Sequence, residues 1–192
     1  MKKAILIAII ILVVGVIAYL VIGPKDRPVP PDSTNKNNNG VTKATMILTS
    51  SAFNHNEKIP SKFTCDGGNI NPELHIQNVP PEAKSLALIV DDPDAVGGRT
   101  FTHWLVWNIN PKTEIIKQES VPSGAIEGKN DAGKVGYLGP CPPDQKPHRY
   151  FFKLYALSQL LNLSPEASKS DLEAAIGNSL IEKTELIGIY ER

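Results

Sequence analysis

The sequence predicts a mainly β domain of antiparallel strands with a few peripheral helices, preceded by a single N-terminal transmembrane helix. Three observations predict this fold class. Residues 4–22 form an uncharged, almost wholly apolar segment. Several later short runs are rich in branched and aromatic side chains, and clusters of proline and glycine separate these runs. Such punctuation favours antiparallel strands with elaborated loops over alternating strand–helix units.

The apolar segment 4–22 predicts a membrane-spanning helix. A helix of this length would be roughly 28 Å long, close to the hydrocarbon thickness of a bilayer. Lys2 and Lys3 precede it, which predicts a single-pass protein of the cell membrane with a cytoplasmic N-terminus. The alternative is a cleaved signal peptide and a secreted body, although the segment is long for that and no Ala-x-Ala site follows. Both interpretations place the body outside the cytoplasm.

Composition divides the chain into an anchor or signal segment (1–23), a disordered linker rich in Pro and Asn (24–45) and a domain (46–192). The formal charge is zero, with 20 basic and 20 acidic residues. Residues 1–45 hold six basic and two acidic residues, so the domain holds 14 basic and 18 acidic ones. An acidic domain argues against nucleic acid as a partner.

Six runs in the domain predict strands. The strongest are residues 85–92 (SLALIVDD), 102–109 (THWLVWNI) and 150–157 (YFFKLYAL), and the weaker ones are residues 46–53, 74–79 and 185–190. One helix is predicted late in the chain. Ser170 is its expected N-cap, Glu173 completes a capping box, and Gly177 is its expected stop.

The motifs of several enzyme classes are absent from the sequence. It contains no G-x-S-x-G, no phosphate-binding Walker loop and no G-x-G-x-x-G. Its cysteines and histidines lack the short paired spacings of zinc sites, so neither a metal nor another cofactor is predicted. No Ser or Cys nucleophile is visibly paired with a base. A non-enzymatic protein is therefore predicted, and a hydrolase with His/Asp acid–base chemistry is the weakest alternative.

Polar residues at strand ends predict a small anion-binding pocket. Asp92 closes one strand and His103 opens the next, so a hairpin would place both at one rim. His148 precedes a third strand, where alternation places it on the same side as Tyr150. Imidazoles beside a carboxylate hold their protons more tightly, and their N–H groups suit a phosphate. The competing interpretation is that each histidine is a structural residue at a strand end.

Several blocks of residues occur together and in order in the domain. They are Cys65-Asp66-Gly67, Asp91-Asp92-Pro93-Asp94-Ala95, FTHWLVWNI (101–109), GKND (128–131), GPCPP (139–143), PHRY (147–150) and ELIGIYER (185–192). Together they resemble the phosphatidylethanolamine-binding protein (PEBP) family, which includes the Raf kinase inhibitor proteins, and especially its bacterial and archaeal branch. The resemblance covers roughly residues 46–192 and implies an antiparallel β-sandwich-like PEBP fold.

The resemblance also implies a small pocket for phosphate, carboxylate or phospholipid head groups. The ligand-binding positions of the family correspond here to Asp92, His103, His148, Tyr150 and Pro142, with Asp94 serving either the ligand or its own loop. The implied function is non-enzymatic binding of a small anion by an exported, membrane-anchored domain. Inhibition or regulation of an extracytoplasmic protein, such as a protease, is the alternative.

Three residues depart from the family pattern. They are Val96, where Pro is usual, Ala132, where an aromatic residue is common, and Leu138, where Gly is common. We expect Val96 to loosen its loop and the other two to alter the pocket wall. The cysteines, Cys65 and Cys141, lie in the shared blocks and are expected to approach each other near the pocket. A disulfide and two buried thiols both fit the sequence.

Overall fold

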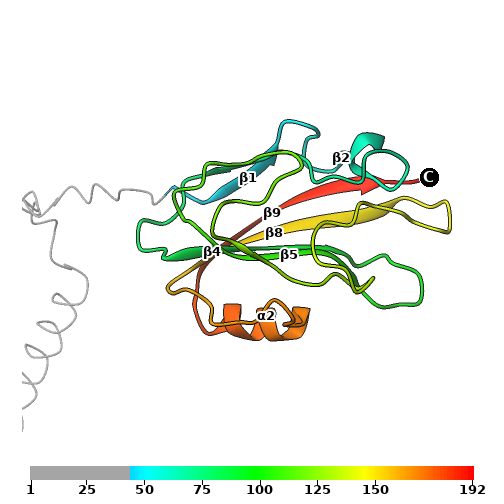
Figure 1. Ribbon diagram of the computed structural model, residues 1–192. Coiled ribbons are helices and arrows are strands. Elements are labelled where there is room, and N and C mark those ends of the chain that lie inside the picture. The colour runs from blue at the N-terminus through cyan, green and yellow to red at the C-terminus, as the bar shows by residue number, and fades with distance from the viewer. Residues whose placement is uncertain (1–43) are drawn as a thin grey trace, which may run out of the picture. The chain divides into compact units, whose positions relative to one another are not determined.

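Two β-sheets pack together in the computed structural model, which describes residues 44–192 (Figure 1). The smaller sheet has the strand order β1-β3-β6, with β1 at Ile47–Ser50, β3 at Leu74–Gln77 and β6 at Ile115–Ile116. The larger sheet has the order β2-β9-β8-β4-β5-β7, and only its β2–β9 pair is parallel. Its strands are β2 (Glu57–Lys58), β4 (Ser85–Asp92), β5 (Phe101–Ile109), β7 (Ile126–Glu127), β8 (His148–Leu157) and β9 (Leu180–Tyr190). A 3-10 turn, η1 (Ser61–Phe63), and one helix, α2 (Lys169–Gly177), complete the described elements.

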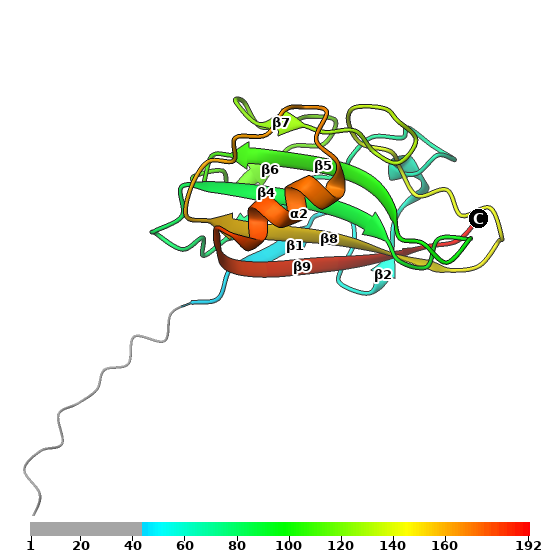
Figure 2. The same ribbon diagram turned by 90° about the horizontal axis from the view of Figure 1, so that it is seen from below.

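The large sheet is covered on both faces. Leu86 and Leu88 of β4 belong to the core between the two sheets, and the intervening Ala87 belongs to a second core under α2. In the view from below, α2 lies across the face of the sheet opposite β1 (Figure 2). Because both faces are buried, β4 reads as a continuous apolar run, with all eight of its residues buried. In β5, Trp104 packs in the core between the two sheets and Trp107 packs in the core under α2.

The mainly β prediction is confirmed for the described residues. Strand β4 has the predicted bounds, and β5 and β8 begin one and two residues before the predicted strands, at Phe101 and His148. Both histidines of the predicted pocket therefore lie within strands. The two-residue strands β2, β6 and β7 were not predicted, because two residues are too few to show an alternating pattern.

The predicted helix exists, but its cap is not the predicted one. Ser168 is the N-cap, and its hydroxyl accepts a hydrogen bond from the backbone N–H of Asp171, which completes the capping box. The expected cap, Ser170, lies inside the helix, and its hydroxyl contacts that of Ser168 at 2.8 Å. The sequence contains two overlapping Ser-x-x-acid patterns, and the helix begins at the earlier one.

The predicted fold class needs one correction, which concerns the transmembrane helix. That segment, residues 4–22, lies outside the described residues. Among residues 44–192, no helix is both long and apolar enough to cross a bilayer. The architecture that the structure supports is therefore the mainly β fold alone, and the membrane-spanning helix is withdrawn from it.

Candidate functional site

Three adjacent strands bring the predicted pocket residues to one end of the large sheet. Strand β4 pairs with β5 on one side and with β8 on the other, both antiparallel. Asp92, the last residue of β4, lies opposite Phe101, so His103 is only two residues from that rim. Because β8 begins at the same rim, His148 and Tyr150 come beside Asp92. The hairpin argument from sequence agrees with this arrangement.

A cavity of about 250 Å³ opens at this rim. Its walls come from the ends of β4, β5 and β8 and from the loops between them. The lining residues are Asp92, Ala95, Val96, Phe101, His103, Leu138, Gly139, Cys141, Pro142, Pro143, His148 and Tyr150. Five of the six predicted ligand-binding residues are in this set, and Asp94 is not.

The ring of His148 lies between two carboxylates. Its Nδ1 is 2.7 Å from Asp92 Oδ2, and its Nε2 is 3.1 Å from Asp144 Oδ1. The ring and the Asp92 side chain are almost completely buried. Burial lowers the pKa of His148, but the hydrogen bonds and charges of Asp92 and Asp144 outweigh it, so the pKa lies above its usual value. We therefore expect an imidazolium that donates from both nitrogens.

His103 has the opposite electrostatic character. Its Nδ1–H donates a hydrogen bond to the carbonyl oxygen of Leu138 at 2.7 Å. Burial lowers the pKa of His103 below its usual value, although this hydrogen bond and the charge of Asp92 partly oppose the shift. The ring is therefore neutral near pH 7, with an unprotonated Nε2. Sequence reasoning predicted a raised pKa beside Asp92, and for His103 burial reverses that direction.

Aromatic rings form much of the remaining cavity wall. The His103 ring contacts Tyr150 edge-on, with 5.2 Å between centroids, and lies 5.0 Å from the ring of Phe101. Burial raises the pKa of Tyr150 far above its usual value, and the charge of Asp92 adds to this effect. The phenol therefore keeps its proton throughout the physiological range and can donate it in a hydrogen bond.

Asp94 holds the loop after β4 and does not line the cavity. Its carboxylate accepts hydrogen bonds from the backbone N–H, Nε and Nη2 of Arg149, at 3.0, 2.8 and 2.7 Å. Its own backbone N–H donates to Asp92 Oδ1 at 2.8 Å. Asp94 therefore fixes Asp92 and the start of β8 relative to each other. Of its two predicted roles, the geometry matches the one within the loop.

The loop that carries Pro142 is anchored to the loop around η1. A disulfide joins Cys65 to Cys141, and the backbone N–H of Gly139 donates to Asn69 Oδ1 at 2.7 Å. A Cβ atom on Gly139 would lie 2.7 Å from the carbonyl oxygen of Phe63, so only glycine fits this approach. Of the two states that the sequence allowed for the cysteines, the structure has the disulfide.

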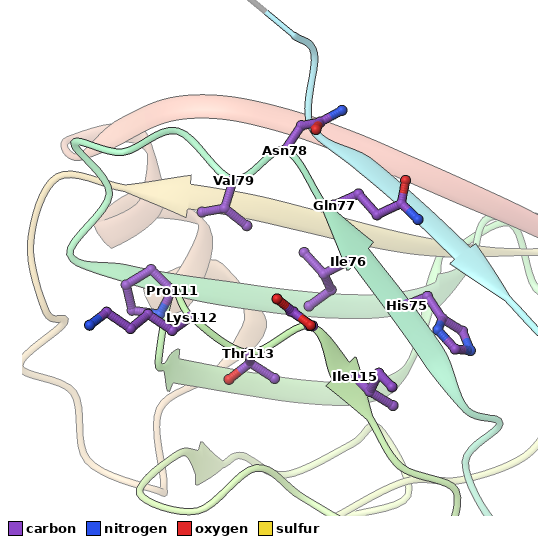
Figure 3. A pocket seen from close by; sticks show the side chains of 10 residues that line it. His75, Ile76, Gln77, Asn78, Val79, Pro111, Lys112, Thr113 and Ile115 are labelled. Carbon is purple, nitrogen blue, oxygen red and sulfur yellow. The ribbon is translucent and has the colours of Figure 1, made fainter.

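A second, larger hollow of about 670 Å³ lies on the small sheet (Figure 3). Its side chains, including His75, Lys112 and Ile115, are spread along β3, β6 and the preceding loop and do not converge on one point. His75 contacts Glu73 at 2.9 Å, outside the hollow's lining. The concentration of buried titratable groups favours the smaller cavity as the functional site.

Among the site residues that sequence reasoning missed, two have side chains that contact a cavity histidine, Phe101 and Asp144. A signal exists for each. Phe101 is two residues before His103 and therefore shares its strand face, and Asp144 is four residues before His148 in a proline-rich loop. Of the three departures from the family pattern, Val96 and Leu138 line the cavity. Ala132 does not, so the expectation that it alters the wall was wrong.

The family model described as phosphatidylethanolamine-binding protein matches residues 49–191 of the chain. An uncharacterised-family protein (UPF0098) from Pyrococcus horikoshii is 52% identical over 153 residues, which are 76% of this chain and 77% of the relative. A PEBP homologue from Chlamydia trachomatis, known from a crystal structure, is 40% identical with a TM-score of 0.73, covering 77% of this chain and 98% of its own. Escherichia coli YbcL, described as a member of the mammalian PEBP family, is 31% identical with a TM-score of 0.73. The match covers 78% of this chain and 99% of YbcL.

Proposed function

The chain belongs to the phosphatidylethanolamine-binding protein family, and from that premise we propose that it binds a small anion in the cavity without catalysing a reaction. The proposed ligands carry a phosphate or a carboxylate, including the head group of a phospholipid. One observation carries the proposal: two buried histidines, a buried tyrosine and a buried aspartate converge on one cavity of about 250 Å³. A cavity of this size accommodates a head group or a small metabolite.

The contents of the cavity support binding over catalysis. Its lining contains no serine, threonine or lysine that could act as a nucleophile. Cys141, the nucleophile that sequence inspection would test first, is bonded to Cys65. A histidine and a carboxylate without a nucleophile suit the recognition of a ligand better than covalent chemistry.

The proposed binding requires the two cavity histidines. Replacing His103 and His148 together by alanine in the full-length chain is expected to reduce phosphate affinity at least tenfold, because the variant loses the cationic ring of His148 and the Nε2 of His103, which becomes a donor when the ring is protonated. Isothermal titration calorimetry with inorganic phosphate measures the change. The double variant of His55 and His75, which do not line this cavity, is the matched control. Equal phosphate affinities in all three proteins would show that the cavity is not the binding site.

Anion affinity is expected to rise as the pH falls. The pKa of His103 lies below its usual value, so in a titration downward from about pH 8 its Nε2 takes up a proton only below the pH at which a free imidazole does, and this proton creates both a donor and a positive charge. The gain cannot exceed about tenfold per pH unit, because one proton is taken up. Sulfate is the suitable probe, since its charge is constant over this range. His103→Ala should flatten the profile, and an equally steep profile in that variant would refute the assignment.

The location of the protein stays a prediction. We propose that the domain works in an oxidising compartment, which the Cys65–Cys141 disulfide favours. Alkylation of the protein in intact cells, before and after reduction, tests this.

The alternative function, inhibition of an extracytoplasmic protein such as a protease, rests on the family resemblance, and a pull-down with the full-length chain would test it.

A further inference from the structure

Both ring nitrogens of His148 face carboxylates. Nδ1 lies 2.7 Å from Asp92 Oδ2 and Nε2 lies 3.1 Å from Asp144 Oδ1. An imidazolium has two N–H donors, so these two contacts use its whole capacity. A ligand that enters the cavity therefore meets a cationic ring with no donor available to it.

The two carboxylates are held very differently. The Asp92 side chain is 5% exposed, ends the central strand β4 and accepts the backbone N–H of Asp94. The Asp144 side chain is 26% exposed and lies in the loop before β8. Its other contacts are local, to the backbone N–H of Lys146 at 3.3 Å and to the ammonium of Lys146 at 4.0 Å. Asp92 is therefore a fixed partner of His148, whereas Asp144 can be replaced without disturbing a strand.

The other polar side chains of the cavity offer few hydrogen-bond donors. His103 uses its Nδ1–H on the carbonyl of Leu138, which leaves Nε2 as an acceptor while the ring is neutral. The Tyr150 hydroxyl is one donor, and Pro142 and Pro143 have no backbone N–H to offer. Among these side chains the strongest donor for an anion is the Nε2–H of His148, which the Asp144 carboxylate already occupies.

We propose that Asp144 is an internal competitor for the anion and lowers the apparent affinity of the site. This inference rests on the proposed function. A bound anion replaces the Asp144 carboxylate at His148 Nε2, and the loop segment around Asp144 moves outward.

The competition applies to every anion that binds at His148 Nε2. A tethered carboxylate acts at an effective concentration in about the millimolar range, so a free monocarboxylate of the same chemistry displaces it only at high concentration. A phosphate or phosphomonoester can carry a double charge, which strengthens its hydrogen bonds to His148 Nε2 and to the Tyr150 hydroxyl. The site therefore favours a phosphate or phosphomonoester over acetate, and Asp144 lowers the apparent affinity for both anions by the same factor.

Substitution of Asp144 in the full-length chain tests the inference. Calorimetry with inorganic phosphate and with acetate is carried out on the wild type, Asp144→Ala and Asp144→Asn. We expect Asp144→Ala to bind phosphate and acetate each about tenfold more tightly than the wild type, because both anions lose the same competitor. Asp144→Asn should be intermediate, because its amide oxygen can still accept from Nε2 but carries no charge. The control is Glu114→Gln, which removes one charge beyond the opposite end of β5 and should change affinity less than twofold.

The outcomes separate this inference from the proposed function. Phosphate binding that His148→Ala weakens, but that Asp144→Ala leaves unchanged or weakens, would overturn the competitor role and leave the anion site standing. Phosphate binding to none of the proteins would overturn both. Nitrogen-15 NMR of the wild type gives an independent check. Saturating phosphate should shift His148 Nε2 and the backbone amides of Gln145 and Lys146, and unchanged resonances in a protein that binds phosphate would contradict the displacement of Asp144.

Discussion

Replacing Phe152 by alanine is expected to lower the free energy of unfolding by about 3–5 kcal/mol. Phe152 is fully buried in the core between the two sheets, with its ring centroid 5.7 Å from that of Phe53. Truncation loses the transfer free energy of the ring and leaves a cavity, because strand β8 is held between β4 and β9 and cannot move in to fill it. Denaturant unfolding followed by circular dichroism measures the loss.

Phe151 is the matched control, because it is adjacent in sequence and points to the opposite face of β8. Its side chain is partly exposed, and the cationic groups of Arg149 and Lys153 lie 5.6 and 5.5 Å from its ring centroid. Phe151→Ala should cost about 1 kcal/mol, the scale of a partly exposed cation–π contact. Similar decreases in the free energy of unfolding for Phe152→Ala and Phe151→Ala would contradict the placement of the two side chains on opposite faces of β8.

Removing the disulfide is expected to lower the free energy of unfolding by about as much as Phe152→Ala does. The double variant Cys65→Ser and Cys141→Ser should lose about 4 kcal/mol of stability, because the bond closes a sequence separation of 76 residues and restricts the unfolded chain. Phosphate binding should weaken as well, since Cys141 lines the cavity and the bond anchors that loop. Thermal unfolding and calorimetry measure the two effects.

Chemical reduction of the wild type provides the control for the cysteine variant. Reduced protein should unfold at nearly the same temperature as the double variant, because both lack the same constraint. Mass spectrometry after alkylation of the native protein should find no modified cysteine. Two alkylated thiols in the native, unreduced protein would contradict the bond.

The larger strands could be predicted from the sequence because buried strands have a recognisable pattern of apolar residues. Residues 86–90 are all apolar because both faces of the strand are covered, and the end of the strand at Asp92 marks the rim of the sheet. The convergence of Asp92, His103 and His148 follows from three antiparallel neighbours sharing one rim. The alternation of His148 and Tyr150 on one face of β8 follows from the period of a strand.

The remaining features depend on tertiary contacts and burial, which the pattern of a single sequence does not show. Asp92 meets His148 and Asp94 meets Arg149, and these partners are set by how the turn after β4 packs against the start of β8. The neutral state of His103 comes from its burial, which outweighs the nearby charge that the spacing suggested. Asp144 reaches His148 from the loop 139–147, whose Cys141 is bonded to Cys65 in a distant part of the sequence.

Strand β9 is synthesised after all the other described strands. It pairs with β8 along most of its length and also with β2. The hydroxyl of Tyr190, its last residue, and the guanidinium of Arg192 both bind Asp66, the neighbour of Cys65. A ribosome-bound chain that has not yet released β9 would expose one edge of β8 and part of the inter-sheet core, which makes it a target for chaperones. The large sheet and the cavity at its rim are thus expected to form only after Tyr190 has left the exit tunnel.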